Sequence, residues 1–192
     1  MQKERLLAFT DGVLAIVITI MVLELRPPHE VTLAGLGAVA PVFLAYVLSF
    51  IYLAIYWNNH HHMMVTVERV NGAILWANMH LLFWLSLVPF TTAWFGETGG
   101  AMWPTVVYGA SLLAAALAYY ILQTLIVRSH GPGHMLKRAI GWDWKGTLSP
   151  VFYLIGIAAS FADPRFGYAM YILVAIIWLV PDRRIERALT AP

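Results

Sequence analysis

The sequence predicts an all-α, polytopic membrane protein in which six transmembrane helices form a single domain over residues 1–192. Hydrophobic residues make up 60% of the chain, and only 11% are Asp, Glu, Lys or Arg, whereas about 25% of the residues in soluble domains are charged. The apolar residues are also gathered into long blocks, and a block of about 18 residues can cross the hydrocarbon core of a bilayer. A soluble fold of this size could not bury so much apolar surface.

Six apolar blocks predict the helices in chain order. They cover residues 6–25, 38–57, 72–94, 103–127, 146–162 and 166–180. Turn-forming or polar segments separate them, and we expect the chain to leave the helical conformation at each one. These segments are Pro27 with Pro28, the polar run 58–71, the glycine-rich run 96–100, the connector 128–145, and Asp163 with Pro164. The connector contains a short amphipathic stretch with Lys137, Arg138, Trp142 and Trp144, which predicts a segment lying on the membrane surface.

The distribution of Lys and Arg predicts the orientation of the helices. Six spans place ten of the twelve basic residues on one side, and basic segments near helix ends are retained in the cytoplasm. The ten are Lys3, Arg5, Arg69, Arg128, Lys137, Arg138, Lys145, Arg183, Arg184 and Arg187, against Arg26 and Arg165 on the other side. Both termini are therefore predicted to be cytoplasmic. The outer side then carries Glu24, Glu30, Glu97 and Asp163, which would attract cations.

An ionisable side chain, Asp11, lies inside the first apolar block. A charge there costs a few kcal/mol or more, so it is expected to find a partner. Arg5 is about 9 Å away along the helix axis and about 120° around it, so the two side chains do not share a face. Candidate partners at the same depth are Trp57, His60, His61, Asn78 and His80. Such a polar network would either only lock the bundle together or support a functional helix.

Aliphatic side chains recur along a second face of the first helix. Ile16, Ile20 and Leu23 follow one another at four- and three-residue steps, with Thr19 beside them, and these steps place side chains on one face. Taken alone, an aliphatic stripe in a membrane helix is ordinary packing or lipid-facing surface. The residues themselves therefore do not assign this face a function.

The first helix resembles the signature of a known channel family. Arg5, Phe9, Thr10, Asp11 and Gly12 form the pattern R-x-x-x-F-[ST]-D-G. This pattern resembles the first helix of the transmembrane protein 175 family, the endolysosomal potassium channels and their bacterial relatives, in which Ser is usual at the place of Thr10. Further matches are Tyr56-Trp57-x-x-His60-His61, Asn78 and Pro89-Phe90-Thr91. Beyond this region the resemblance is one of topology only.

The resemblance implies an architecture and a set of site residues. Bacterial members are six-helix subunits of the plasma membrane that assemble as homotetramers around a potassium-conducting pore, which the first helix, about residues 6–25, lines. The resemblance assigns the pore constriction to Ile16, Ile20 and Leu23, with a ring of Thr19 hydroxyls. The supporting polar network would comprise Arg5, Thr10, Asp11, Trp57, His60, His61 and Asn78. The resemblance implies no cofactor; potassium ions are the permeant species, and membrane lipid is an expected partner. The T-V-G-Y-G filter of ordinary potassium channels is absent from the sequence.

A proton-coupled secondary transporter is the main alternative to a channel. Asp11 and the nearby histidines could relay protons, although such transporters are built from inverted repeats with helices broken at the midplane. A metal site is disfavoured, because His60, His61 and His62 are consecutive and point about 100° apart on a helix. Enzyme activity is not expected, since the sequence contains no H-E-x-x-H, G-x-S-x-G or phosphate-binding glycine loop. The net charge of +2 is too small to indicate a nucleic-acid partner.

Overall fold

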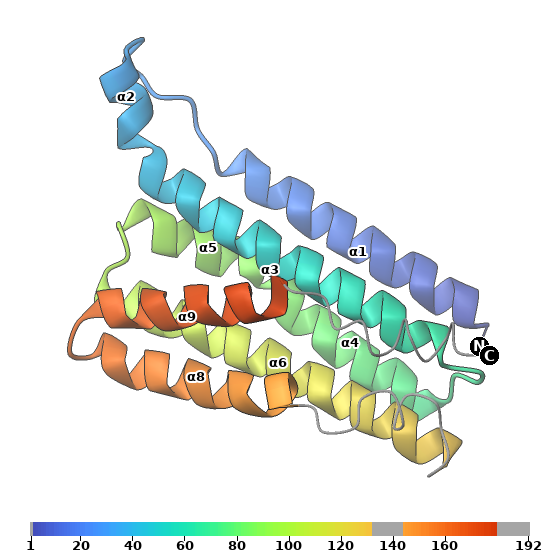
Figure 1. Cartoon of the computed structure of the whole chain (residues 1–192). Helices are drawn as coiled ribbons and strands as arrows, with labels where there is room; N and C mark the ends of the chain where they lie inside the picture. Colours follow the sequence, from blue (N-terminus) through green and yellow to red (C-terminus); the bar gives the residue numbers. More distant parts are fainter. Residues whose placement is uncertain (1, 132–143, 180–192) are drawn as a thin grey trace.

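The computed structural model describes residues 2–131 and 144–179, and all of its regular elements over these ranges are α-helices (Figure 1). The elements are α1 (Lys3–Leu23), α2 (Leu33–Ala38), α3 (Ala40–Val65), α4 (Gly72–Ser86), α5 (Val88–Glu97), α6 (Met102–His130), α8 (Trp144–Ser160) and α9 (Pro164–Leu179). Four segments are long and apolar enough to cross a membrane: α1, α3, α6 and the α4–α5 pair. α8 and α9 are shorter, with 17 and 16 residues.

The second predicted helix extends further than expected. α3 continues to Val65, so the prediction that the chain leaves the helix at 58 was wrong for residues 58–65. The reason is that polar side chains in this stretch find partners on α3 itself or on a neighbouring helix. The Asn59 amide donates to the carbonyl of Ile55, 2.9 Å away, and His60 is bonded to Asn78. Satisfied in this way, these residues do not need to leave the bundle for water.

The third predicted helix is divided in two, at Leu87. Pro89 lies in the first turn of α5, where it has no N–H to donate to the preceding turn and its ring would clash with an uninterrupted helix. Pro41 has the same place in α3, where it separates that helix from α2. α2 itself was not predicted; its first turn is capped by the Thr32 hydroxyl, which accepts a hydrogen bond of 3.0 Å from the Gly35 N–H.

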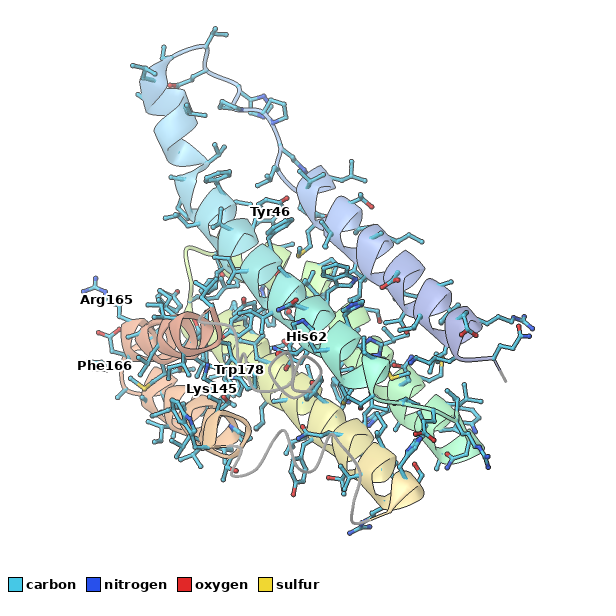
Figure 2. The ribbon with its side chains drawn as sticks, turned by 45° about the vertical axis from the view of Figure 1, so that its right-hand side comes forward. Tyr46, His62, Lys145, Arg165, Phe166 and Trp178 are labelled. Carbon is cyan, nitrogen blue, oxygen red and sulfur yellow. The ribbon has the colours of Figure 1, made fainter. Side chains whose placement is uncertain are left out.

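The helices form an elongated bundle with α1 on one side and α8 and α9 on the other (Figure 1). α1 packs against α3, α4 and α5, while α8 packs against α6 and α9. α8 and α9 are joined at their far ends by Lys145, whose Nζ lies 5.8 Å from the centre of the Trp178 ring. Figure 2 shows Arg165 at the opposite end of α9, pointing away from the bundle. The amphipathic stretch predicted around Lys137, Arg138 and Trp142 lies outside the described residues.

Two groups of buried side chains make up the core. One joins α1, α3, α4 and α6. The other lies between α3, α5, α6, α8 and α9 and is built from aromatic rings, with Phe95 stacked on Tyr108 at 4.9 Å. Tyr171 ties this second group together, because its hydroxyl donates to the carbonyl of Thr105 and its own carbonyl accepts from the Tyr52 hydroxyl. In a bilayer such contacts and close packing hold helices together, since lipid tails are as apolar as the core.

Close approach of α3 and α5 depends on a glycine. A Cβ atom at Gly96 would lie 2.8 Å from the Cα of Val42, and because that neighbour is backbone it cannot rotate away. We expect Gly96→Ala to force the two helices apart and to lower the stability of the protein by about 1–3 kcal/mol. Thermal unfolding in detergent, followed by tryptophan fluorescence, measures the effect.

Gly72→Ala is the matched control for this substitution. A Cβ atom at Gly72 would meet no heavy atom of the described chain within 4 Å. The Gly72→Ala variant should therefore unfold at the same temperature as the wild-type protein. Equal unfolding temperatures for Gly96→Ala and wild type would show that α3 and α5 are not in the close contact described.

Candidate ion-conduction site

α1 presents two different faces to its surroundings. One face is buried against the bundle and consists of Leu6, Thr10, Leu14, Val17 and Met21. Their three- and four-residue spacing puts them on a single stripe. The stripe fixes which way the rest of the helix points, because a rotation of α1 would expose it.

The aliphatic stripe predicted from the sequence lies on the outward side of α1. Ile16, Ile20 and Leu23 are 59%, 42% and 76% exposed in the isolated subunit, and the mean angular positions of the two stripes differ by about 110°. Thr19 is exposed beside them, and its hydroxyl donates to the carbonyl of Ile16, 2.9 Å away. The face is therefore free to meet lipid, water or another subunit.

An open groove of about 730 Å³ runs between α1 and α5. Ile16 and Ile20 form part of one wall, and Phe90 and Trp94 part of the other. Its lining also includes two carboxylate residues, Glu24 and Glu97, which also line the neighbouring hollow beside α2. Sequence reasoning placed both carboxylates at the outer ends but did not associate them with the aliphatic stripe. No sequence signal indicates that association, because it depends on how α5 packs.

Asp11 is bonded to a side chain of α3. The indole N–H of Trp57 donates to Asp11 Oδ1 at 2.9 Å, a hydrogen bond strengthened by the negative charge. The imidazole ring of His61 stacks on the Trp57 indole, and the two ring centres are 6.1 Å apart. Asp11, Trp57 and His61 are all exposed in the isolated subunit. This group therefore forms part of the surface of the subunit and joins α1 to α3 from outside.

A second polar group is fully buried between α1, α3 and α4. His60 Nε2 is 2.8 Å from Asn78 Oδ1, and Asn78 Nδ2 donates to the Thr10 hydroxyl at 2.9 Å. Because the Asn78 carbonyl can only accept, His60 carries a proton on Nε2. The three residues are 2%, 0% and 1% exposed, respectively. One amide thus links all three helices, and its donor and acceptor sides are both used.

The remaining predicted polar residues lie outside these two groups. Arg5 is exposed near the start of α1, and His80 accepts a 2.9 Å hydrogen bond from Trp84 on its own helix. His62 is half-buried, with its ring 5.9 Å from His61. The seven residues predicted to form one network are therefore divided between two contact groups, with Arg5 in neither. Among residues 2–131 and 144–179, no three His, Cys, Asp or Glu side chains are placed to hold a metal ion.

Comparison with known proteins identifies the family. The family model described as "Endosomal/lysosomal potassium channel TMEM175" matches residues 5–89, a region that contains both polar groups and all of α1 except its first two residues. A protein of Chryseobacterium sp. named as a potassium channel is 54% identical over 98% of this chain and 98% of its own length. The chain belongs to the TMEM175 family. The resemblance stated from the first-helix motif is thereby confirmed.

A solved structure and a more distant relative extend the comparison. The crystal structure of a lysosomal potassium-selective channel TMEM175 homologue from Chamaesiphon minutus has a TM-score of 0.81 at 27% identity, covering 94% of this chain and 97% of that one. A Mus musculus protein named as an endosomal/lysosomal proton channel is 33% identical over 46% of this chain but only 20% of its own length. Members of the family are named as channels, in agreement with the expectation that the chain is not an enzyme. The chain is an integral, multi-pass membrane protein.

Loss of Asn78 is expected to destabilise the protein. Asn78→Leu keeps a similar volume but leaves His60 and Thr10 buried without their partner, which costs about 1–3 kcal/mol for an unpaired buried group. Asn59→Ala is the control, because the side chain of Asn59 donates to a carbonyl of its own helix and does not join two helices. Thermal unfolding in detergent should separate the two variants by several degrees. If both unfold like wild type, the buried amide is not structurally important.

Proposed function

We propose that the chain is the subunit of a potassium channel, in which four copies of α1 surround a common axis. The observation that carries this proposal is the 54% identity, over almost the whole of both chains, to a relative named as a potassium channel. A second support is the outward position of Ile16, Ile20 and Leu23, which the buried stripe of α1 fixes. We also propose that residues 1–192 act as a single channel domain of the bacterial plasma membrane, with six spans and cytoplasmic termini.

The constriction in this proposal is a set of aliphatic rings. Ile16, Ile20 and Leu23 from four subunits would enclose a narrow, dry passage that closes by dewetting. Such rings offer no oxygen to an ion, so a passing ion keeps its water or loses part of it at a cost. Potassium holds its water less tightly than sodium because it is larger, which gives a preference for potassium. The Thr19 hydroxyls would compensate part of the lost hydration.

The surrounding residues have supporting roles in this mechanism. The buried amide of Asn78 would fix the rotation of α1 through Thr10, and Trp57 would hold it through Asp11. Arg5 is proposed to lie at the inner mouth, since it is exposed near the start of the helix. Glu24 and Glu97 line the groove next to the stripe and would raise the local concentration of cations at the outer mouth. Potassium is then the permeant species, and no resident cofactor takes part.

A proton-coupled transporter is the second candidate. It is favoured by the surface carboxylate of Asp11. However, the Asp11 carboxylate is bonded to Trp57, whose indole carries no exchangeable charge, while His60 is bonded to Asn78. Within residues 2–131 and 144–179, no hydrogen bond joins Asp11 directly to a histidine. Single-channel current steps distinguish the two candidates, because a transporter produces none.

The proposed pore is tested by the substitution Ile16→Asn. The purified protein is placed in planar bilayers with potassium on one side and sodium on the other. Its reversal potential should then be displaced toward the equilibrium potential of potassium. Ile16→Asn introduces a polar side chain into the dry ring, so we expect a larger current and at least a several-fold weaker preference for potassium. The control is Ile172→Asn on α9, a residue 46% exposed on the other side of the bundle. Unchanged current and selectivity in Ile16→Asn would remove this residue from the constriction.

A further inference from the structure

The end of α6 is joined to the loop between α3 and α4 by a single histidine. His130 Nε2 lies 3.2 Å from the backbone nitrogen of Glu68 and 3.3 Å from that of Arg69, and both N–H groups donate to it. Its other ring nitrogen, Nδ1, is 2.9 Å from the carbonyl oxygen of Ile126 and 3.1 Å from the hydroxyl of Ser129. The ring thus contacts the last turn of its own helix and a loop whose two amides, at Glu68 and Arg69, are 62 and 61 residues away in the chain.

These contacts fix the protonation state of the ring. Backbone N–H groups only donate, so Nε2 must present a lone pair to Glu68 and Arg69. The Ile126 carbonyl only accepts, so Nδ1 must carry the hydrogen. The two requirements agree, and together they define the neutral imidazole with its proton on Nδ1. A doubly protonated ring has no lone pair on Nε2 and cannot accept from either loop amide.

The loop that His130 holds connects the helices of both polar groups. α3 carries Trp57 and His60, and α4 carries Asn78. At the start of the loop, the N–H groups of Thr66 and Val67 bond back to the last turn of α3, and at its end Asn71 caps α4 by accepting from Ile74. Between these two anchored points, Glu68 and Arg69 are bonded through their N–H groups to His130.

We propose that His130 is a pH-sensitive latch, which holds the α3–α4 loop against the end of α6 while its ring is neutral and releases it when the ring is protonated. Histidine changes its charge between about pH 5 and 8. The contact requires the deprotonated Nε2, so it is complete at the alkaline end of this range and is lost as the pH falls. The latch faces the end of the bundle at which α1 begins (Figure 1), so on the proposed orientation it responds to cytoplasmic pH.

Among residues 2–131 and 144–179, the charged side chains of the segments that adjoin the latch come from the α3–α4 loop, α6 and α1. The loop contributes the side chains of Glu68 and Arg69, both exposed, and α6 contributes Arg128. From α1, Lys3 reaches the end of α3, where its Nζ donates to the carbonyl of Val65 at 3.2 Å. Lys and Arg stay positive across this pH range. We assign the pH dependence of the contact to the imidazole ring, because the Nε2 lone pair accepts from both loop amides.

Imidazole nitrogen spectra test the assigned state directly. The protein labelled with ¹⁵N-histidine, in lipid nanodiscs at pH 7.5, should give for His130 a protonated Nδ1 and an unprotonated Nε2, the less common form of the neutral ring. Comparison with the spectrum of His130→Gln identifies the signals among those of the seven histidines. A ring protonated on Nε2 at this pH would overturn the proposal.

Amide hydrogen exchange tests the latch itself. The protection of the Glu68 and Arg69 amides against exchange, relative to the intrinsic rate at each pH, should be about tenfold lower at pH 5.5 than at pH 7.5. A tenfold change corresponds to the loss of one hydrogen bond per amide. Gln has a carbonyl oxygen at about the reach of Nε2 and does not titrate, so His130→Gln should keep the slow exchange at both pH values. His130→Ala should exchange rapidly at both.

His29→Gln is the matched control, because His29 is exposed in the segment between α1 and α2, at the opposite end of the bundle. It should behave like wild type at both pH values. Equal exchange in wild type and His130→Ala at pH 7.5 would exclude the latch, and so would a pH effect that persists in His130→Gln. None of these measurements uses ion current, so the latch stands or fails independently of the proposed channel function.

Discussion

The hydrogen bonds of the Asn78 amide are the interaction on which the rest of this structure depends. Inside a bilayer, apolar side chains gain little by meeting one another in place of lipid, and the rotation of a helix is set by packing and by the few polar contacts it makes. Asn78 bonds to Thr10 on α1 and His60 on α3. This arrangement turns one stripe of α1 inward and leaves the stripe of Ile16, Ile20 and Leu23 outward. The position of the candidate pore face is therefore a consequence of a polar contact on the other side of the helix.

Much of the architecture could be predicted from composition alone. The centres of the helices follow from the length of the apolar blocks, because hydrocarbon tolerates little else. The ends were less predictable where polar residues have partners inside the bundle: Asn59 and His60 are typical of a loop in sequence, but in the structure they continue α3. The break at Leu87 has a sequence signal in Pro89, whereas the groove between α1 and α5 has none, because it depends on how two helices meet.

The candidate site shows the same division between local and long-range information. The bond between Asp11 and Trp57 joins residues 46 positions apart, and both were expected at one depth because each lies near the same end of its helix. Sequence could not predict that the polar residues divide into a surface group and a buried group, since this requires the angle at which α1 crosses α3 and α4. It also gave no indication of His130, whose partners are backbone amides and so have no side-chain signature.

The interruption at Leu87 has a mechanical consequence. A continuous helix transmits a twist or tilt along its whole length, whereas a helix divided by a proline does not have to. The half that begins at Gly72 carries Asn78 and is bound to the fixed side of α1, and the half that begins at Val88 carries Phe90 and Trp94 and forms the wall of the groove. The wall beside the aliphatic stripe and the Asn78 anchor therefore belong to separate helices, so a movement of one is not passed rigidly to the other.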